Sequence, residues 1–449
     1  MNWLKKRLQA NRDILRLAIP SIISNITVPL LGIVDVAIVG HIGDENYIGA
    51  IAIGSMIFNV IYWLFGFLRM GTSGFTSQAF GAGNTQATAY VLRKMLVLSF
   101  GVAAAFVLFQ LPIRHLAFLL MGVNNDIHPL VATYYNIVVW GAPATLGLYV
   151  LTGWLVGMQN TRVPMWVSIA QNIINIAASA LLVFAFHMGI AGVAIGTLVA
   201  QWAGFVMSLL SLRSCYAQEW QTAISNAITK LQSHTEIFTI SFFSANRDIF
   251  LRTLCLVSVN LFFTAAGSRQ GAMMLSVNTL LMTFFTLFSY VMDGFAYAGE
   301  ALAGRYFGAR DTASLNLLAR RLLGWGMTLS VAFSLVYLLA GEAILGLLTD
   351  KQPVVVAADD YRLWAVAVPL TGFAAFVFDG IFIGITATRA MFMSCFVGAI
   401  AFFLIYYSLF GEWHNHALWL ALNIYLALRG VVLAVVFMRG NKQKTQKRV

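Results

Sequence analysis

Residues 14–40 read ILRLAIPSIISNITVPLLGIVDVAIVG, an apolar run that holds a single acidic residue, Asp35, and two prolines, Pro20 and Pro29. A helix needs about 20 apolar residues to cross a hydrocarbon core roughly 30 Å thick, and this run is long enough. The chain is 60% hydrophobic and only 10% charged, with a mean hydropathy of +0.80, which is more apolar side chain than one soluble core can bury. Comparable stretches recur at 49–78, 91–111, 130–157, 164–187, 189–212, 238–266, 272–303, 318–340, 361–386, 390–410 and 416–438. The sequence therefore predicts an all-α polytopic membrane protein with twelve transmembrane helices.

The two halves of the chain share short motifs in the same order. The tetrapeptide NRDI occurs at 11–14 and again at 246–249, each time near the start of an odd-numbered span. Further along, one constant offset relates three matching pairs: residues 80–82 and 307–309 (both FGA), Gly157 and Gly384, and His187 and His414. This register predicts two six-helix repeats with the same orientation in the membrane, related by an axis along the membrane normal.

The repeat also predicts the domain organisation. We expect an N-terminal six-helix lobe over 1–213, a polar cytoplasmic linker over 214–236, a C-terminal six-helix lobe over 237–438 and a basic cytoplasmic tail over 439–449. Parallel repeats of this kind usually place a substrate pathway between two lobes that rock about it, so the duplication favours a transporter. The alternative is that the duplication records ancestry alone, as in some channels. We expect the transporter to be a monomer.

The formal charge of +11 follows from membrane topology. Lys and Arg sit in short clusters between apolar spans and concentrate in alternate loops, and in membrane proteins the cytoplasmic loops carry that excess. This pattern places both termini in the cytoplasm. We expect the chain to lie in a bacterial inner membrane, with the lipid bilayer as its partner. It also argues against a nucleic-acid partner, which would require the basic residues on one soluble face.

Motifs for catalysis or metal binding are missing from the sequence. Cys215, Cys255 and Cys395 lie far apart and outside any CxxC spacing, and the loop pair His414 and His416 has no third ligand nearby. Neither an ATP-binding motif nor a grouping of nucleophile, base and orienting residue is present. We therefore expect no enzymatic activity, no metal and no cofactor other than a coupling ion.

Asp35 is the best candidate for a coupling residue. It lies five residues before Gly40, the outer end of its span, and so roughly 8 Å below the membrane boundary at ~1.5 Å per residue. A charge in hydrocarbon costs at least ~2.5–3.5 kcal/mol, so an embedded acid is a functional candidate. Burial favours the neutral acid, whose protonation can then couple proton flow to a conformational change. The alternative is a hydrogen-bonded structural carboxyl.

Pro20 gives the same helix a point of bending. An interior proline removes one backbone hydrogen bond and makes a bend cheap. Many membrane helices carry prolines as fixed kinks, so the sequence alone leaves a moving hinge and a fixed kink as alternatives.

Polar residues follow one face of the span 164–187, at spacings of four, three and four: Ser168, Asn172, Asn175 and Ser179. The next span repeats the pattern with Thr197 and Gln201. Ser179 and Thr197 each lie eight residues from the outer end of their span, roughly 12 Å deep and comparable to Asp35. These side chains either line an outward-opening pocket of the first lobe or make hydrogen bonds between helices.

The second lobe contains three embedded acids, Asp293, Glu300 and Asp379, which lie toward the cytoplasmic side. Their depth differs from that of Asp35, so we interpret them as an inner gate or a cation-attracting patch rather than as a second copy of its site. Arg69 and Arg429 lie nearer the ends of their spans, and we interpret them as interfacial, structural side chains.

The residues from Leu17 to Asp35, together with residues 78–82 (QAFGA) and 293–297 (DGFAY), resemble the multidrug and toxic compound extrusion (MATE) family, and its DinF branch in particular, over nearly the whole chain. The resemblance implies an exporter of varied, often cationic, organic compounds that is driven by an inward proton or sodium gradient. In that branch a helix-one aspartate is the proposed proton site, and its protonation is proposed to bend the helix at a proline. The resemblance assigns those roles to Asp35 and Pro20, and the accompanying pocket to Asn175, Ser179 and Thr197.

Two departures from the family pattern bear on the coupling ion. Many relatives carry a second aspartate where this chain has Ser179, and the span 249–266 lacks the embedded glutamate of sodium-coupled relatives. We therefore expect proton antiport through Asp35. Sodium is the alternative, because a carboxylate with the oxygens of Asn175 and Thr197 can hold a hard cation. A flippase for lipid-linked oligosaccharide is the runner-up, but it would need a strongly cationic cavity, whereas the embedded charges are mainly acidic.

Overall fold

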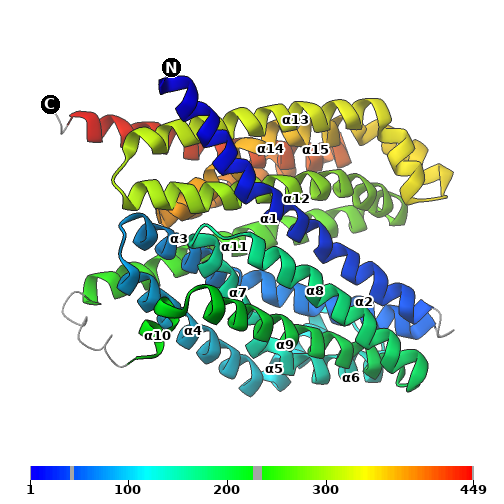
Figure 1. Cartoon of the computed structure of the whole chain (residues 1–449). Coiled ribbons are helices and arrows are strands. Elements are labelled where there is room, and N and C mark those ends of the chain that lie inside the picture. The colour runs from blue at the N-terminus through cyan, green and yellow to red at the C-terminus, as the bar shows by residue number, and fades with distance from the viewer. Residues whose placement is uncertain (1, 41–44, 226–234, 447–449) are drawn as a thin grey trace. The chain divides into compact units, whose positions relative to one another are not determined.

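The structure is a computed structural model that describes the backbone of residues 2–40, 45–225 and 235–446. Side chains are described throughout these ranges except at 2–5, 28–37, 39–40, 45, 235–241 and 441–446. The described backbone consists of helices joined by short connections and contains no strand (Figure 1). The all-helical prediction is confirmed.

The helices of the first half are α1 (Asn2–Gly40), α2 (Glu45–Leu64), α3 (Phe67–Gly81), α4 (Thr85–Leu108), α5 (Gln110–Met121), α6 (His128–Val138), the 3-10 turn η1 (Val139–Gly141), α7 (Ala142–Gly157), α8 (Arg162–Ala180), the π turn η2 (Leu181–Ala185) and α9 (Gly189–Cys215). The short α10 (Ala217–Ile224) lies in the predicted linker, of which residues 226–234 are outside the described part of the chain. The second half contains α11 (Thr235–Arg269), α12 (Ala272–Gly308), α13 (Thr312–Leu348), α14 (Gln352–Gly384) and α15 (Thr388–Gln446).

Each predicted span corresponds to helical structure. Within the described residues, ten helical segments are long and apolar enough to cross a membrane. One of them, α15, joins the predicted spans 390–410 and 416–438, which meet at a break in helical geometry at His414 (φ 44°, ψ −118°). The span 14–40 lies in α1, which is not among the ten. With α15 counted as two spans and α1 added, the arrangement is the predicted one of twelve helices.

Three of the predicted spans are not single regular helices. The span 49–78 is interrupted at residues 65–66, between α2 and α3. The span 130–157 is interrupted by η1 just ahead of Pro143, whose ring nitrogen has no hydrogen to donate to the preceding turn. The span 164–187 changes to a π turn in its last residues. Hydropathy predicts where a segment crosses the membrane, but it does not detect these local changes in helix geometry.

The chain divides into two compact units, Ile23–Phe242 and Met1–Ile22 with Phe243–Val449. The predicted lobes place all of the first helix in the N-terminal lobe, whereas here α1 contributes to both units. The division falls between Ile22 and Ile23, directly after Pro20. The basic tail continues α15 as a helix to Gln446.

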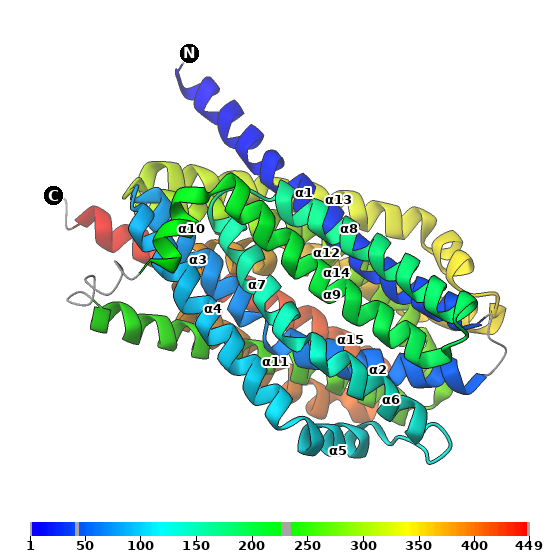
Figure 2. The same cartoon turned by 60° about the horizontal axis from the view of Figure 1, so that its bottom comes forward.

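Within each unit one helix packs against most of the others. In the unit 23–242, α7 packs on α3, α4 and α9, while α8 packs on α9. In the other unit, α14 packs on α12, α13 and α15. Figure 2, turned by 60° from Figure 1, shows the helices from a second side.

Glycines allow the tightest of these helix crossings, and they repeat. A Cβ atom on Gly153 of α7 would lie 2.3 Å from the carbonyl oxygen of Arg69 in α3. A Cβ atom on Gly380 of α14 would lie 2.2 Å from the carbonyl oxygen of Ala296 in α12. Gly380 corresponds to Gly153, and Ala296 corresponds to Arg69, by the same offset that relates Gly384 to Gly157. The α3–α7 crossing and the α12–α14 crossing are therefore the same feature in the two halves.

Left-handed backbone conformations repeat with this same offset. The three pairs are Gly83 (φ 67°) and Arg310 (φ 57°), Gln159 (φ 64°) and Thr386 (φ 52°), and His187 (φ 54°) and His414 (φ 44°). Only glycine adopts this region without steric cost, yet five of these six residues have side chains. The turns that follow corresponding helices thus keep the same backbone shape in both halves, which makes the internal repeat visible in the structure.

The glycine crossing gives a test of this packing. We expect Gly380→Ala to lower the thermal unfolding midpoint of the purified protein in detergent, because the new methyl group meets backbone, which cannot rotate away; overpacking of this kind costs about 1–3 kcal/mol. Gly346→Ala in α13 is the matched control, since a Cβ atom there has nothing within 4 Å. A Gly380→Ala protein at least as stable as the control would contradict the close α12–α14 crossing.

Candidate functional site

Thr27 of α1 connects this helix to α8. Its hydroxyl oxygen lies 3.2 Å from that of Ser168, and its carbonyl oxygen accepts a hydrogen bond of 2.8 Å from Nδ2 of Asn172. In an apolar bundle such bonds hold two helices together and satisfy groups that lipid cannot. Ser168 and Asn172, the first two polar residues on this face of the span 164–187, therefore make a contact between helices. This is one of the two interpretations that the sequence allows.

The other two polar residues on this face lie against α9. Nδ2 of Asn175 donates to Oγ1 of Thr197 over 3.1 Å, and that hydroxyl donates to the Val193 carbonyl over 3.0 Å. Ser179 is also directed at α9: a Cβ atom on Gly196 would lie only 2.2 Å from its Oγ. We call Asn172, Asn175, Ser179 and Thr197 the polar seam.

Two oxygens of the polar seam are among the buried side-chain atoms that lack a described hydrogen-bond partner. Asn175 and Ser179 are each 0% exposed, and neither Asn175 Oδ1 nor Ser179 Oγ has a hydrogen-bond partner within the described part of the chain. A buried polar group without a hydrogen bond costs roughly 1–3 kcal/mol, so native structures contain few of them, and some of the exceptions have a functional role. The seam thus offers two buried oxygens to a further donor.

The side chain of Asp35 lies outside the described residues, but its backbone in α1 is described. The chain that follows α1 meets the chain that follows α8 and η2, since Tyr47 Oη in the first turn of α2 lies 3.4 Å from the Cβ position of Gly189, the first residue of α9. The two helices therefore run in the same direction from the Thr27 contact. Eight residues beyond Thr27, roughly 12 Å at ~1.5 Å per residue, α1 reaches the level of Asn175 and Ser179. The backbone of Asp35 lies at that level.

Gln201 belongs to the predicted pocket but occupies a different place. Its Oε1 lies against the 3-10 turn η1, where a Cβ atom on Gly141 would be 1.6 Å away. Gln201 Oε1 has no hydrogen-bond partner among the described residues. Gln201 follows Thr197 by one helical turn, as the sequence pattern requires. Its long side chain, however, extends toward Gly141, where the absence of a side chain leaves room for it.

Pro20 is buried, and α12 lies beside it in the same unit. A Cβ atom on Gly294 of α12 would lie 3.0 Å from the Ala18 carbonyl oxygen, 3.0 Å from the Ile22 amide nitrogen and 2.3 Å from Ile22 Cγ1. Backbone on both sides of Pro20 therefore rests directly on Gly294. Sequence reasoning missed this residue, although it directly follows Asp293.

Asp379 of α14 is paired with two arginines from other helices. Its Oδ2 accepts hydrogen bonds from Nη2 of Arg252 in α11 and, at 2.6 Å, from Nη2 of Arg429 in α15. All three side chains are at most 8% exposed. We call them the charge cluster; it contains two positive charges and one negative charge.

The charge cluster corrects two predictions. Arg429 is not an interfacial side chain that reaches toward water, because it is buried and bound to Asp379. Asp379 is not part of a cation-attracting patch, because two guanidinium groups already neutralise it and leave the cluster with a net positive charge. Sequence reasoning also missed Arg252, although a charge inside the apolar span 238–266 was the signal that could have found it.

Glu300 and Asp293 lie on α12, apart from these bonds. Glu300 is fully buried, and its carbonyl oxygen lies 2.4 Å from the Cβ position of Gly384. Asp293 is half-buried. The described hydrogen bonds of Asp379 lead to α11 and α15 and not to either acid. The three predicted acids therefore do not form one shared site through those bonds.

Metal-ligand geometry is absent from the described ranges. No group of three or more His, Cys, Asp or Glu side chains there could hold a metal ion. What the arrangement offers chemically is a set of buried amide and hydroxyl oxygens in the first half and a buried charge cluster in the second.

Comparison with known proteins gives the chain's relatives. The MatE family model matches it twice, at residues 20–181 and 249–407. DNA damage-inducible protein F of Escherichia coli is 38% identical over 431 residues, which cover 96% of this chain and 92% of that protein. The probable multidrug resistance protein NorM of Thermotoga maritima is 21% identical over 353 residues, 77% of this chain and 74% of that protein.

Solved structures share the fold. A crystal structure of MATE in the bent conformation superimposes with a TM-score of 0.85 at 18% identity and covers 99% of this chain and 98% of its own. The Vibrio cholerae MATE transporter VcmN in the bent form gives a TM-score of 0.86 at 17% identity, covering 98% and 99%. At this level of identity the likeness establishes the arrangement of helices.

The charge cluster predicts an order of stabilities. Asp379→Asn leaves two buried guanidinium groups without a counter-charge, and breaking a buried pair in this way costs about 3–5 kcal/mol. Arg429→Gln leaves a neutral Asp379–Arg252 pair, so we expect a smaller loss, and we expect the double variant to be more stable than Asp379→Asn alone. Thermal unfolding in detergent measures all three.

Asp359→Asn is the matched control, because the Asp359 side chain is 63% exposed in its pair with Arg362 and such surface pairs contribute little. Equal losses for Asp379→Asn and Asp359→Asn, or a double variant less stable than both single variants, would show that the cluster is not held by its charges.

Proposed function

The chain belongs to the MatE family of membrane transporters, and from that premise we propose that it exports organic, often cationic, compounds in exchange for protons that enter the cell. It is a multi-pass membrane transporter and not an enzyme. We further propose that it works as a monomer in the bacterial inner membrane with both termini in the cytoplasm, as the distribution of Lys and Arg favours. Efflux is supported by its multidrug-resistance relative.

A single observation carries the coupling proposal: the polar seam holds two fully buried oxygens with no described partner at the level where α1 places Asp35. We propose that the protonation of Asp35 decides whether its carboxyl group can bond to these two oxygens. A protonated carboxyl can donate a hydrogen bond to such an oxygen, whereas the carboxylate can only accept. The protonated form therefore suits Asn175 Oδ1, and the charged form suits water or a cationic substrate.

This difference suggests the order of events. A carboxylate in a low-dielectric site attracts an organic cation, and a proton arriving from the outer side removes that attraction. We propose that the protonated side chain then binds the seam, α1 bends near Pro20, and the compound leaves outward. Release of the proton to the cytoplasm resets the site.

Support for a hinge at Pro20 comes from the packing of α1. The helix passes from one compact unit to the other within two or three residues of the proline. On both sides of Pro20, at Ala18 and Ile22, its backbone rests on Gly294, which has no side chain. Smooth backbone contact of this kind allows one helix to slide or lift without breaking side-chain bonds.

Sodium is the second candidate for the coupling ion. Hard cations prefer oxygen ligands, and Asn175 Oδ1, Ser179 Oγ and Thr197 Oγ1 are all oxygens. The charge cluster offers no second cation site, because arginines already bind Asp379. The test for coupling therefore needs both ions.

Asp35→Asn tests the coupling role. In everted vesicles with an acidic interior and no sodium gradient, we expect wild type to accumulate ethidium and the variant to lose this pH-driven uptake, because the amide cannot exchange a proton. Asp13→Asn, the same change earlier in α1, should transport as wild type does. Undiminished pH-driven uptake by Asp35→Asn would contradict a role of Asp35 in proton coupling. Uptake by wild type that is driven only by a sodium gradient at constant pH would establish sodium as the coupling ion.

Gly294→Ala tests the hinge. The new methyl group would meet the α1 backbone at Ala18 and Ile22, so we expect the initial rate of pH-driven ethidium uptake to fall several-fold while the protein remains folded. The control is Gly324→Ala in α13, where a Cβ atom has nothing within 4 Å. Wild-type rates for Gly294→Ala would mean that α1 does not move against α12.

A further inference from the structure

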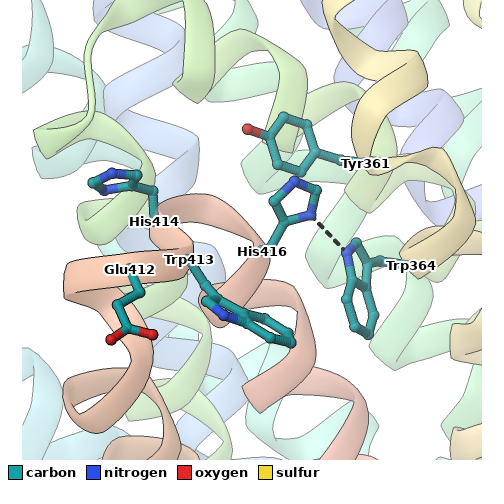
Figure 3. Close-up of a pocket in the computed structure, with 6 residues that line it drawn as sticks. All are labelled: Tyr361, Trp364, Glu412, Trp413, His414 and His416. Carbon is teal, nitrogen blue, oxygen red and sulfur yellow. Dashed lines mark hydrogen bonds between the residues drawn. The ribbon is translucent and has the colours of Figure 1, made fainter.

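A cavity of about 410 Å³ lies in the second half of the chain, where α14 passes the break in α15. Its volume is within the range of roughly 300–1,000 Å³ that small-molecule sites occupy. Six residues line it: Tyr361, Trp364, Glu412, Trp413, His414 and His416 (Figure 3). None of them belongs to the polar seam or to the charge cluster.

The aromatic wall of this cavity is fixed before any ligand arrives. Nε1 of Trp364 donates a hydrogen bond of 3.0 Å to Nδ1 of His416, and the His416 ring packs against the Tyr361 ring at an angle of 40°, with centroids 4.6 Å apart. Because its Nδ1 accepts, this imidazole carries its proton on Nε2 and is uncharged in the arrangement shown. Three rings from two helices are thus locked together, which lowers the entropic cost of binding against them.

The break in α15 supplies the other lining residues. At His414 the backbone takes φ 44° and ψ −118°, so Glu412 and Trp413 come from the end of one helical segment and His416 from the start of the next. Figure 3 shows the Trp413 indole on the side of His416 and Trp364. Trp413 is 46% exposed, so its ring is available for contact.

The internal repeat provides a comparison within the same chain. His187, the counterpart of His414 in the first half, has the same left-handed backbone, so the turn itself is inherited from the duplication. The lining is not inherited. The positions that correspond to Trp364, Glu412 and His416 hold Ile137, Ala185 and Gly189. An acid, an indole and an imidazole are therefore particular to the second half.

The chemistry of the lining selects a positive ligand. The Glu412 carboxylate makes no ion pair or hydrogen bond within the described ranges, so its charge is available to a ligand. The faces of Trp and Tyr rings attract cations, and more strongly where water is displaced. A cavity of this size that is lined by both a carboxylate and aromatic rings fits an apolar organic cation better than an anion or a sugar.

We propose that this cavity binds organic cations and is a second binding station for the compounds that the protein exports. The role as a station rests on the proposed function, whereas cation binding itself does not.

The experiment measures equilibrium binding of tetraphenylphosphonium to the purified full-length protein in detergent at pH 8. Tetraphenylborate, nearly the same size and of opposite charge, is the paired probe. We expect Glu412→Gln and Trp413→Leu each to weaken tetraphenylphosphonium binding at this station about tenfold, and Glu412→Gln to leave tetraphenylborate binding unchanged or stronger. Glu342→Gln in α13 and Trp140→Leu in η1, both at exposed positions, are the matched controls.

Thermal unfolding first confirms that each variant is folded. Wild-type affinity for tetraphenylphosphonium in both Glu412→Gln and Trp413→Leu would overturn the inference and leave these aromatics as anchors at the membrane interface. Equal weakening of both probes by Glu412→Gln would also overturn it. Vesicle uptake separates the two proposals. Loss of tetraphenylphosphonium binding in the variants supports the cation site whether or not wild type transports. Absence of pH-driven transport by wild type would refute the proposed function alone.

Discussion

Every polar group inside the hydrocarbon of a bilayer must find its partner within the protein, because lipid offers none. Helices solve this problem for the backbone, and the side chains that remain must pair across helices or carry an energetic penalty. The two halves of this chain began from the same arrangement, as the repeated glycine crossings and left-handed turns show. They satisfy the constraint in different ways.

In the second half, the charge cluster pairs one buried carboxylate with two guanidinium groups from two other helices. In the first half, the polar seam is only partly satisfied, and the unpaired oxygens of Asn175 and Ser179 lie where α1 brings Asp35. Asp379 Oδ1 and Arg429 Nε also lack a described hydrogen-bond partner, so the two halves differ in charge rather than in the number of bonds made. The carboxylate of the charge cluster already has its counter-charges, whereas the polar seam offers neutral oxygens to a proton donor or a cation. This contrast is our reason for placing ion coupling in the first half.

Features that depend on local patterns could be predicted from the sequence. Hydropathy found the membrane spans, and the constant offset between matching motifs found the repeat. A helical period of polar residues predicted that Asn172 and Asn175 share a face, and their bonds to Thr27 and Thr197 follow from it.

Features that depend on contacts between distant residues could not be predicted. Arg252 and Arg429 lie 127 and 50 residues from Asp379, and nothing in their neighbourhoods indicates the pairing. The turn of Gln201 toward Gly141 depends on space left by a missing side chain, and so does the contact of α1 with Gly294. The sequence predicted a loop between two spans at His414. The cavity beside it could not be predicted, because its lining residues come from two helices that are distant in the sequence.

The central claim is that substrate and proton compete at the first-lobe site through Asp35, and proton release on binding tests it most directly. Tetraphenylphosphonium would be added to purified, weakly buffered wild-type protein and to Asp35→Asn, with and without sodium, while the pH is followed. The account predicts that wild type releases protons when the cation binds, equally in both salts, and that Asp35→Asn binds without releasing them. Binding to wild type without proton release, or the same release from Asp35→Asn, would contradict it.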